Sequence, residues 1–300
     1  METNIGATGV VGQRFVRRLA QHPLFEIAHL AASERSSGKR YGDACAWRLS
    51  GEAYAGFADR VLDPCDPQQA FSPIVFSALD TEPARELEPA FAAAGSLVFS
   101  NAGAFRMASD VPLLIPEVNA AHLALVARQR AARGWRGGIV CNPTCTATML
   151  ALALAPLHQA FGVEAVLMAS LQAVSGAGYP GVPSLDILGN VITYIRDEEP
   201  KIEIEINKML GHLSHGAIRP APFAVTAHAN RVPVEHGHTV CLSVEFEQSA
   251  GADAVSALLR DWRGAEEARG LPSSPPRPLV LRDEPDRPQP RRDRMEGNGM

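Results

Sequence analysis

The sequence predicts an α/β fold in which a Rossmann-type parallel sheet domain is followed by an α+β domain. Three observations lead to this prediction. A glycine-rich segment near the N-terminus precedes a helical stretch, short apolar runs then alternate with helical stretches, and the pattern changes near residue 140. Strands that alternate with helices favour a parallel sheet covered on both faces. The 300 residues, 46% hydrophobic and 20% charged, have the composition of an ordinary globular protein.

The first half supplies the strands and helices of the predicted parallel sheet. A helix is expected at 12–23, where Phe15, Val16 and Leu19 share one face. The remaining expected elements are strands at 25–33, 73–80 and 96–103, and a helix at 82–95. Only residues 1–5 precede the glycines, and their Glu, Thr and Asn are unusual for a buried central strand.

The second half has the pattern of an α+β domain. It predicts a helix at 146–161, a strand at 163–176, an alternating strand region at 228–247 and a helix at 252–262. From Leu271 onward the chain is rich in Pro and Arg, which favours an extended path across the surface. We therefore expect domains at 1–142 and 143–300.

Composition excludes several classes of function. A net charge of -5 gives no electrostatic case for nucleic-acid binding. No apolar run approaches the length of a membrane span, and residues 1–9 do not resemble a secretory signal. The five scattered cysteines fit free thiols in a reducing compartment, so we expect a cytoplasmic protein.

The glycine-rich segment, "IGATGVVGQRFV", places Gly6, Gly9 and Gly12 directly before a helix. Glycines at a strand-to-helix turn let the backbone approach a phosphate, although this GxxGxxG spacing is a variant of the usual dinucleotide fingerprint. After the next expected strand comes "ASERSSGKR", with Ser33, Arg35, Ser36, Lys39 and Arg40. Hydroxyls and cations suit a 2′-phosphate, which favours NADP over NAD, whereas Glu34 argues mildly for NAD.

Cys145 lies in "NPTCTATML", on a turn that opens a run of good helix formers. A helix N-terminus carries partial positive charge and free N–H groups, and a cysteine there tends to lose its proton. Cys145 is therefore a candidate nucleophile. The alternative reading is a small residue packed in a turn.

These segments together resemble the aspartate-semialdehyde dehydrogenase family, in particular its archaeal and fungal branch. The matching stretches occur in family order over nearly the whole chain: "GATGVVGQRF", "FSAL", "SNAGAFRM", "VPLLIPEVN", "NPTCTATML", "LQAVSGAGYPGVPSLDILGNVI", "EEPKIEIEINKMLG", "RVPVEHGHT" and "RDEPDRPQPRRDR". The resemblance implies that the second domain carries catalysis and dimerisation. It also implies NADP-dependent reductive dephosphorylation of L-aspartyl 4-phosphate to L-aspartate 4-semialdehyde, or the reverse, in lysine, threonine and methionine biosynthesis.

The resemblance assigns roles to individual residues. It implies catalysis by Cys145 as the nucleophile that forms a thioester, by His238 as acid–base group, and by Gln172 as the residue that positions the substrate. Arg231 would bind the substrate carboxylate and Glu198 its amine, while Arg106 and Lys201 would bind phosphate. The expected cofactor contacts are Gly6, Thr8, Gly9, Val10, Val11, Gly12, Ser33, Arg35, Ser36, Ser77, Leu79, Ser175 and Gly176.

Two other readings concern cysteine and histidine. Cys141 lies within an expected strand and is assigned to packing. His236 and His238 would share a strand face if their segment were extended, but with no third ligand evident we expect no metal. The partners implied are a small-molecule substrate, inorganic phosphate and other copies of the chain in a homodimer or homotetramer.

The sequence departs from the family pattern at both ends. The first strand is short, and the family continues beyond "GNGM" with a strand and a helix that returns to the cofactor site. We therefore expect a chain truncated at both ends, and both an active and an inactive protein are compatible with the sequence. Alternative functions are a related N-acetylglutamyl-phosphate or malonyl-CoA reductase, and an inactive remnant that pairs with another subunit.

Overall fold

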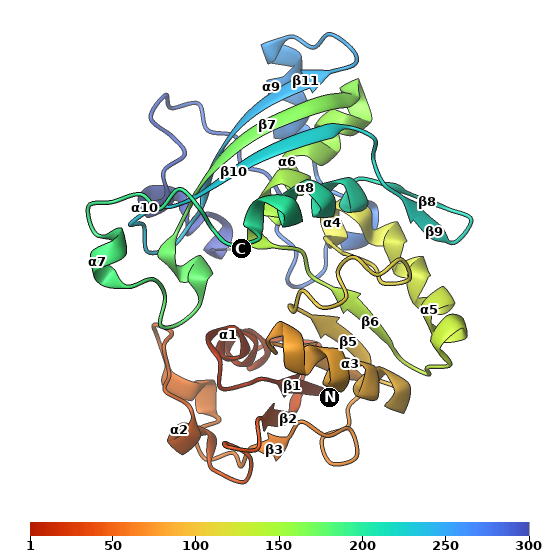
Figure 1. The fold of residues 1–300 in the computed structure, drawn as a ribbon, viewed down its shortest axis with the longest axis vertical. Helices are drawn as coiled ribbons and strands as arrows, with labels where there is room; N and C mark the ends of the chain where they lie inside the picture. Colours follow the sequence, from red (N-terminus) through yellow and green to blue (C-terminus); the bar gives the residue numbers. More distant parts are fainter. Residues whose placement is uncertain (300) are drawn as a thin grey trace. The chain divides into compact units, whose positions relative to one another are not determined.

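The computed structural model describes residues 1–299, which fold as two compact units (Figure 1). The first unit comprises residues 1–114, 121–143 and 215–217, and the second comprises residues 115–120, 144–214 and 218–299. None of the helices in the described part of the chain is long and apolar enough to cross a membrane.

A six-stranded parallel sheet forms the centre of the first unit, in the order β3-β2-β1-β4-β5-β6. This confirms the predicted parallel sheet. Its strands are β1 (Glu2–Ile5), β2 (Ile27–Ala32), β3 (Asp63–Pro64), β4 (Ile74–Ser77), β5 (Leu97–Ser100) and β6 (Gly138–Cys141). The helices are α1 (Val10–Leu19), α2 (Tyr41–Ala44), η1 (Ala53–Gly56), α3 (Thr81–Ala94), η2 (Ala120–Ala124) and α5 (Leu125–Arg133).

Strand β1 forms in the middle of the sheet despite its polar sequence. It pairs in parallel with β2 on one side and β4 on the other, and all four of its residues are buried. The polar side chains are accommodated by hydrogen bonds. The Thr3 hydroxyl donates to the Ala70 carbonyl at 2.8 Å, and the Asn4 amide donates to the Gly12 carbonyl at 2.9 Å. A central strand can therefore be polar where neighbouring loops supply acceptors.

The second unit is built on a three-stranded mixed sheet. Strand β7 (Val163–Gln172) lies in the middle, parallel to β10 (Ala224–Arg231) and antiparallel to β11 (Thr239–Phe246). Helices α6 (Cys145–Phe161) and α8 (Glu198–Met209) pack against this sheet (Figure 1). The other elements are α4 (Pro116–Asn119), η3 (Val174–Ala177), α7 (Ser184–Ile187), β8 (His212–Ser214), β9 (Ala217–Arg219), α9 (Ala252–Asp261), η4 (Glu266–Ala268), α10 (Pro290–Asp293) and η5 (Glu296–Asn298).

The two faces of this sheet differ in burial. Along β7, Met168, Ser170 and Gln172 are buried, whereas Leu167 and Leu171 are 60% and 39% exposed. Directly paired positions on neighbouring strands share a face. The strand register therefore adds further exposed residues to the face of Leu167. We call this the open sheet face, defined by Leu167, Leu171, Thr226, His228, Cys241 and Ser243.

Candidate active site

Helix α6 begins at Cys145, and Thr144 immediately before it has the extended backbone of an N-cap residue. The Thr144 N–H donates to a carboxylate oxygen of Glu205 at 2.7 Å. This hydrogen bond fixes the backbone that leads into the helix. Cys145 itself is exposed to solvent. The fold thus presents a cysteine thiol at the first position of a long helix, as a nucleophile requires.

His238 lies against Cys145, with its Nε2 atom 3.1 Å from the sulfur. The other ring nitrogen, Nδ1, lies 3.0 Å from the backbone nitrogen of Ala173. A backbone N–H can only donate, so Nδ1 accepts and carries no proton. A neutral His238 therefore carries its proton on Nε2, and this proton points to the sulfur of Cys145.

Burial and neighbouring charges shift the pKa values of Cys145 and His238 toward their neutral forms. Burial raises the pKa of the Cys145 thiol, and the negative charge of Glu198 adds to this effect. Water reaches the cysteine, but protein atoms displace much of the solvent that would stabilise a thiolate. Hydrogen bonds from Thr146 oppose the rise. Burial also lowers the pKa of His238, and the charge of Arg231 lowers it further.

These shifts correct the expectation that the helix N-terminus makes Cys145 acidic. A thiolate–imidazolium pair would require a proton on Nδ1, where the Ala173 N–H already points. The protein without ligands is therefore arranged as a thiol beside a neutral imidazole. A nearby cation can shift this balance toward the thiolate.

Three further predicted residues surround the pair. The Gln172 side-chain amide donates to a carboxylate oxygen of Glu198 at 3.1 Å, and the Thr146 hydroxyl lies 3.3 Å from the same oxygen. Arg231 ends strand β10, is 6% exposed, and donates from Nη1 to the Ala173 carbonyl at 2.8 Å. Thus Cys145, Gln172, Glu198, Arg231 and His238 form one cluster, built from α6, β7, α8, β10 and the segment before β11.

Gly176 has a role here that the sequence did not indicate. A Cβ atom at this position would lie 2.8 Å from Nη1 of Arg231 and 3.0 Å from Cε1 of His238. Glycine therefore lets the turn after β7 pass close to both side chains. Ser175 and Gly176 were expected at the cofactor, and the structure places them in η3 of the second unit.

The two candidate phosphate-binding residues lie in different surroundings. Lys201 is exposed on α8, one turn after Glu198. Arg106 belongs to the first unit, where its Nη2 donates to the Asn101 carbonyl at 2.8 Å. The Asn142 side chain also donates to Asn101, at 2.9 Å. Arg106 is therefore held at the carboxyl end of the parallel sheet.

The first unit contains a cavity of about 810 Å³ at the glycine-rich turn. Six of the predicted cofactor residues line it: Gly6, Thr8, Gly9, Ser33, Arg35 and Leu79. The cavity is also lined by residues that were not among the expected cofactor contacts: Ala32, Glu34, Pro64, Cys65, Asp66, Gln69, Ala78, Asp80, Pro83 and Leu87. Several of these residues directly follow β3 and β4. Because cofactors bind at the carboxyl ends of parallel strands, the residues after each expected strand could have been selected from the sequence.

Other predicted cofactor residues do not line this cavity. Val10, Val11 and Gly12 lie in α1, and Ser36 lies in the turn after β2. Gly12 packs against the backbone of Gly6 and Ala7, where a Cβ would clash. Ser77 is fully buried and its hydroxyl donates to Glu88 at 2.7 Å. These two residues therefore shape the turn and the sheet beneath the cavity.

The glycine turn fits a dinucleotide phosphate. Gly6 has a φ of 79°, and a Cβ there would lie 2.8 Å from the Ala78 carbonyl oxygen. Only glycine allows this close approach between the ends of β1 and β4. The turn leads directly into the N-terminus of α1, which attracts negative charge.

The two neighbouring histidines do not lie on a common strand. Residues 232–238 form a turn in which Gly237 has a φ of 90°. His236 lies 3.6 Å from a carboxylate oxygen of Glu235. Within residues 1–299, no group of three or more His, Cys, Asp or Glu side chains is arranged to hold a metal ion.

Comparison with known proteins identifies the family. A profile described as "Semialdehyde dehydrogenase, NAD binding domain" matches residues 4–126, and one described as "Semialdehyde dehydrogenase, dimerisation domain" matches residues 154–300. An aspartate-semialdehyde dehydrogenase of Archaeoglobus fulgidus is 49% identical over 99% of this chain and 85% of the relative. The chain belongs to the aspartate-semialdehyde dehydrogenase family. The dimerisation-domain match also indicates that the subunit self-associates.

Fungal members of the family are also similar to this chain. The aspartate-semialdehyde dehydrogenase of Trichophyton rubrum is 44% identical, covering 98% of this chain and 84% of its own. The crystal structure of the Candida albicans enzyme with NADP has a TM-score of 0.90 and 39% identity, and the match covers 99% of this chain and 87% of that one. These similarities confirm the predicted archaeal and fungal branch. The match to the archaeal relative covers 99% of this chain, so the family resemblance extends over nearly all of its length.

Proposed function

We propose that this protein is an NADP-dependent aspartate-semialdehyde dehydrogenase that interconverts L-aspartyl 4-phosphate and L-aspartate 4-semialdehyde. The observation that carries the proposal is the contact between Cys145 and His238 beside the buried guanidinium of Arg231. A nucleophile, a proton-bearing imidazole and a carboxylate-binding cation are the groups that this reaction needs. The family's relatives of the same name support the substrate.

In the oxidative direction, the Cys145 thiolate attacks the aldehyde carbon and forms a carbon–sulfur bond. Negative charge then develops on the aldehyde oxygen, and the Nε2–H of His238 is placed to donate to it. The chemistry that NADP supplies when bound is hydride exchange with the carbon attached to Cys145. Inorganic phosphate attacks the resulting thioester, which releases the acyl phosphate and restores the thiolate. The biosynthetic direction is the reverse.

The substrate is held by the residues around the nucleophile. Arg231 binds the α-carboxylate and Glu198 binds the α-amine, while Gln172, which donates to Glu198, sets its orientation. Arg106 and Lys201 bind the phosphate. The cofactor is held by the glycine turn and the lining residues Thr8, Ser33, Arg35 and Leu79. Residues 1–142 form the cofactor-binding domain and residues 143–300 the catalytic and dimerisation domain.

The open sheet face supports a homodimer. Leu167 and Leu171 expose apolar surface in the middle of a regular sheet, within the region that matches a dimerisation domain. Exposed apolar patches of this kind mark protein interfaces. A homotetramer would need a second contact. The five free cysteines fit a cytoplasmic location.

A substrate comparison tests the proposal. The purified protein is assayed in the oxidative direction with NADP, phosphate and L-aspartate 4-semialdehyde, and in the reductive direction with N-acetylglutamyl phosphate and malonyl-CoA as rival acyl donors. We expect turnover with the aspartate substrate alone, and its loss in Arg231→Leu. Faster turnover with a rival donor would contradict the proposal, and inactivity with all of them would favour a non-catalytic subunit.

A further inference from the structure

The segment that carries His238 is held from two sides. On one side it contacts η3, which follows β7: Val174 and Ser175 donate from their backbone nitrogens to the carbonyls of Val234 and Glu235 at 2.8 and 3.2 Å. On the other side α10 packs against Gly237, the residue before His238. A Cβ atom on Gly237 would lie 3.1 Å from Cβ of Pro290 and 3.5 Å from Cβ of Arg294.

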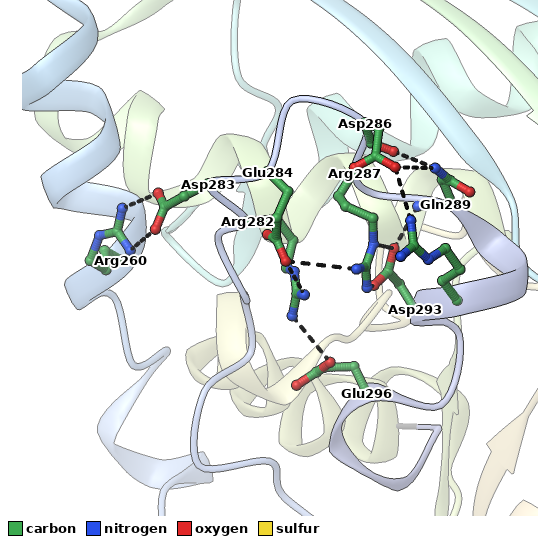
Figure 2. A network of polar contacts seen from close by, with 10 residues as sticks. Arg260, Arg282, Asp283, Glu284, Asp286, Arg287, Gln289, Asp293 and Glu296 are labelled. Carbon is green, nitrogen blue, oxygen red and sulfur yellow. Dashed lines mark hydrogen bonds and ion pairs between the residues drawn. The ribbon is translucent and has the colours of Figure 1, made fainter.

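Helix α10 has only four residues, so its own backbone hydrogen bonds cannot fix its position. A network of charged side chains does so (Figure 2). Asp293, on α10, accepts two hydrogen bonds from the guanidinium of Arg287 and a third from the backbone N–H of Gln289 at 2.6 Å. The side chains of Arg287 and Asp293 are 11% and 14% exposed.

The same network extends to neighbouring parts of the C-terminal segment. Glu284 accepts from Arg282 at 2.7 Å and lies 3.7 Å from Arg287, and Arg282 also lies 3.6 Å from Glu296 (Figure 2). A two-bond arginine–carboxylate contact that is mostly shielded from water is stronger and more directional than an exposed pair. The network therefore holds α10 at a defined place against Gly237.

We propose that the Arg287–Asp293 pair is a positioning device for catalysis: it holds α10 against Gly237 and thereby keeps Nε2 of His238 directed at Cys145. Arg287 and Asp293 do not touch the reacting atoms. They act through α10 on the turn of residues 235–238. This gives a function to the stretch "RDEPDRPQPRRDR", which the proposed activity does not otherwise use.

The test replaces Asp293 by asparagine, which keeps the size of the side chain but removes its charge. Alkylation of Cys145 by iodoacetamide is measured against pH, with the full chain and without substrate. The proposal rests on the Cys145–His238 pair of the proposed function, but this readout does not depend on which substrate is used. Asp293→Asn should change the pH profile toward that of His238→Ala, and kcat should fall on the order of 10- to 100-fold with KM little changed.

Asp283→Asn is the matched control. Asp283 lies in the same segment and pairs with Arg260 of α9 at 2.8 Å, so this exposed pair does not involve α10. The control should keep the wild-type pH profile. If Asp293→Asn does not fold, Arg287→Lys, which keeps the charge but loses the two-bond geometry, takes its place. A variant that is less stable but whose folded fraction keeps the wild-type pH profile would overturn the proposal.

Discussion

Nε2 of His238 faces the sulfur of Cys145 at 3.1 Å while Nδ1 of the same ring accepts a hydrogen bond from the Ala173 backbone. The neutral imidazole therefore acts as a hydrogen-bond donor, through Nε2–H, toward the sulfur of Cys145. It is suited to hold the oxyanion formed by attack on a carbonyl, and it is poorly suited to take the thiol proton. The thiol must lose its proton to solvent or when a ligand changes the local charge.

Cys145→Ser should reduce turnover by roughly 10³-fold or more, because serine is a much weaker nucleophile at neutral pH. Cofactor binding should survive, since the glycine turn lies in the first unit. Steady-state kinetics and NADPH fluorescence titration measure the two effects. Cys141→Ser is the control, because Cys141 is buried at the end of β6 and should affect turnover far less. Near wild-type turnover in Cys145→Ser would disprove the assignment of the nucleophile.

The rate of Cys145 alkylation should increase with pH in the protein without ligands. Burial and Glu198 raise the pKa of the thiol, so at neutral pH most molecules carry a protonated sulfur. Each unit of pH should raise the thiolate fraction, and with it the rate, about tenfold until the thiol pKa is approached. Stopped-flow measurements with iodoacetamide between about pH 6 and pH 9 test this. A rate that is already constant near pH 6 would show a thiolate–imidazolium pair instead.

Arg35→Ala should weaken NADP binding by roughly 10- to 100-fold, which is the usual effect of losing a hydrogen bond to a charged group. Arg35 lines the cofactor cavity beside Ser33, where a 2′-phosphate is expected. Affinity for NAD should change little. Lys39→Ala is the matched control, because this exposed cation lies in the same turn but does not line the cavity. If Arg35→Ala lost equal affinity for NAD and for NADP, the proposed contact of Arg35 with the 2′-phosphate would be wrong.

Glu88→Gln should stabilise the protein above neutral pH. The Glu88 carboxyl is fully buried below the sheet, and burial raises its pKa although Ser77 and Ser100 donate to it. The stability contributed by its proton is present below the unfolded pKa of about 4.3 and is lost as the pH rises through the folded value. Glutamine needs no proton to remain neutral.

Thermal unfolding at several pH values tests this effect of Glu88. The melting temperature of Glu88→Gln should fall less steeply with pH than that of the wild type, and each kcal/mol gained corresponds to about 2–4 °C. Glu86→Gln, on the exposed side of the same helix, should follow the wild type. If the melting temperatures of Glu88→Gln and the wild type changed with pH in parallel, the prediction that burial raises the pKa of Glu88 would be wrong.

Leu167→Asp should separate the proposed dimer. The side chain is 60% exposed in a single chain, so the subunit should still fold. Burying an unpaired carboxylate in an interface costs several kcal/mol, which corresponds to a loss of affinity of roughly 100-fold or more. Sedimentation velocity measures whether the protein is a monomer or a dimer. Thiol labelling of Cys241, which lies on the same sheet face, should become faster in the monomer. Leu24→Asp, in the first unit, is the control, and a Leu167→Asp protein of unchanged mass would refute this interface.

Local patterns were sufficient to predict most of the elements. The alternation of apolar runs and helical stretches gave the parallel sheet, and helix α6 begins within one residue of the expected position. These features depend on residues close together in the chain, where side-chain period and helix-start signals act. Six of the expected cofactor residues line the cavity, because the glycine-rich turn and the segments after the strands are also recognisable from local sequence.

Features that depend on distant residues could not be predicted in this way. Strand β1 tolerates Thr3 because the Ala70 carbonyl, far along the chain, accepts its proton. The proton on Nε2 of His238 follows from the backbone of Ala173, and the raised pKa of Cys145 follows in part from Glu198. A helix N-terminus alone predicted the opposite shift, because the sequence does not show which charges will surround the thiol.

The edge of the three-stranded sheet illustrates how this subunit limits its own association. Strand β10 is an edge strand, and Glu199 and Glu203 of α8 accept hydrogen bonds from the N–H groups of Ala229 and Ala227 at 2.9 and 3.2 Å. Two donors that could recruit a foreign strand are thereby occupied. Growth of the sheet by addition of strands along β10 is disfavoured, so copies of the chain can meet face to face without seeding an open-ended fibre.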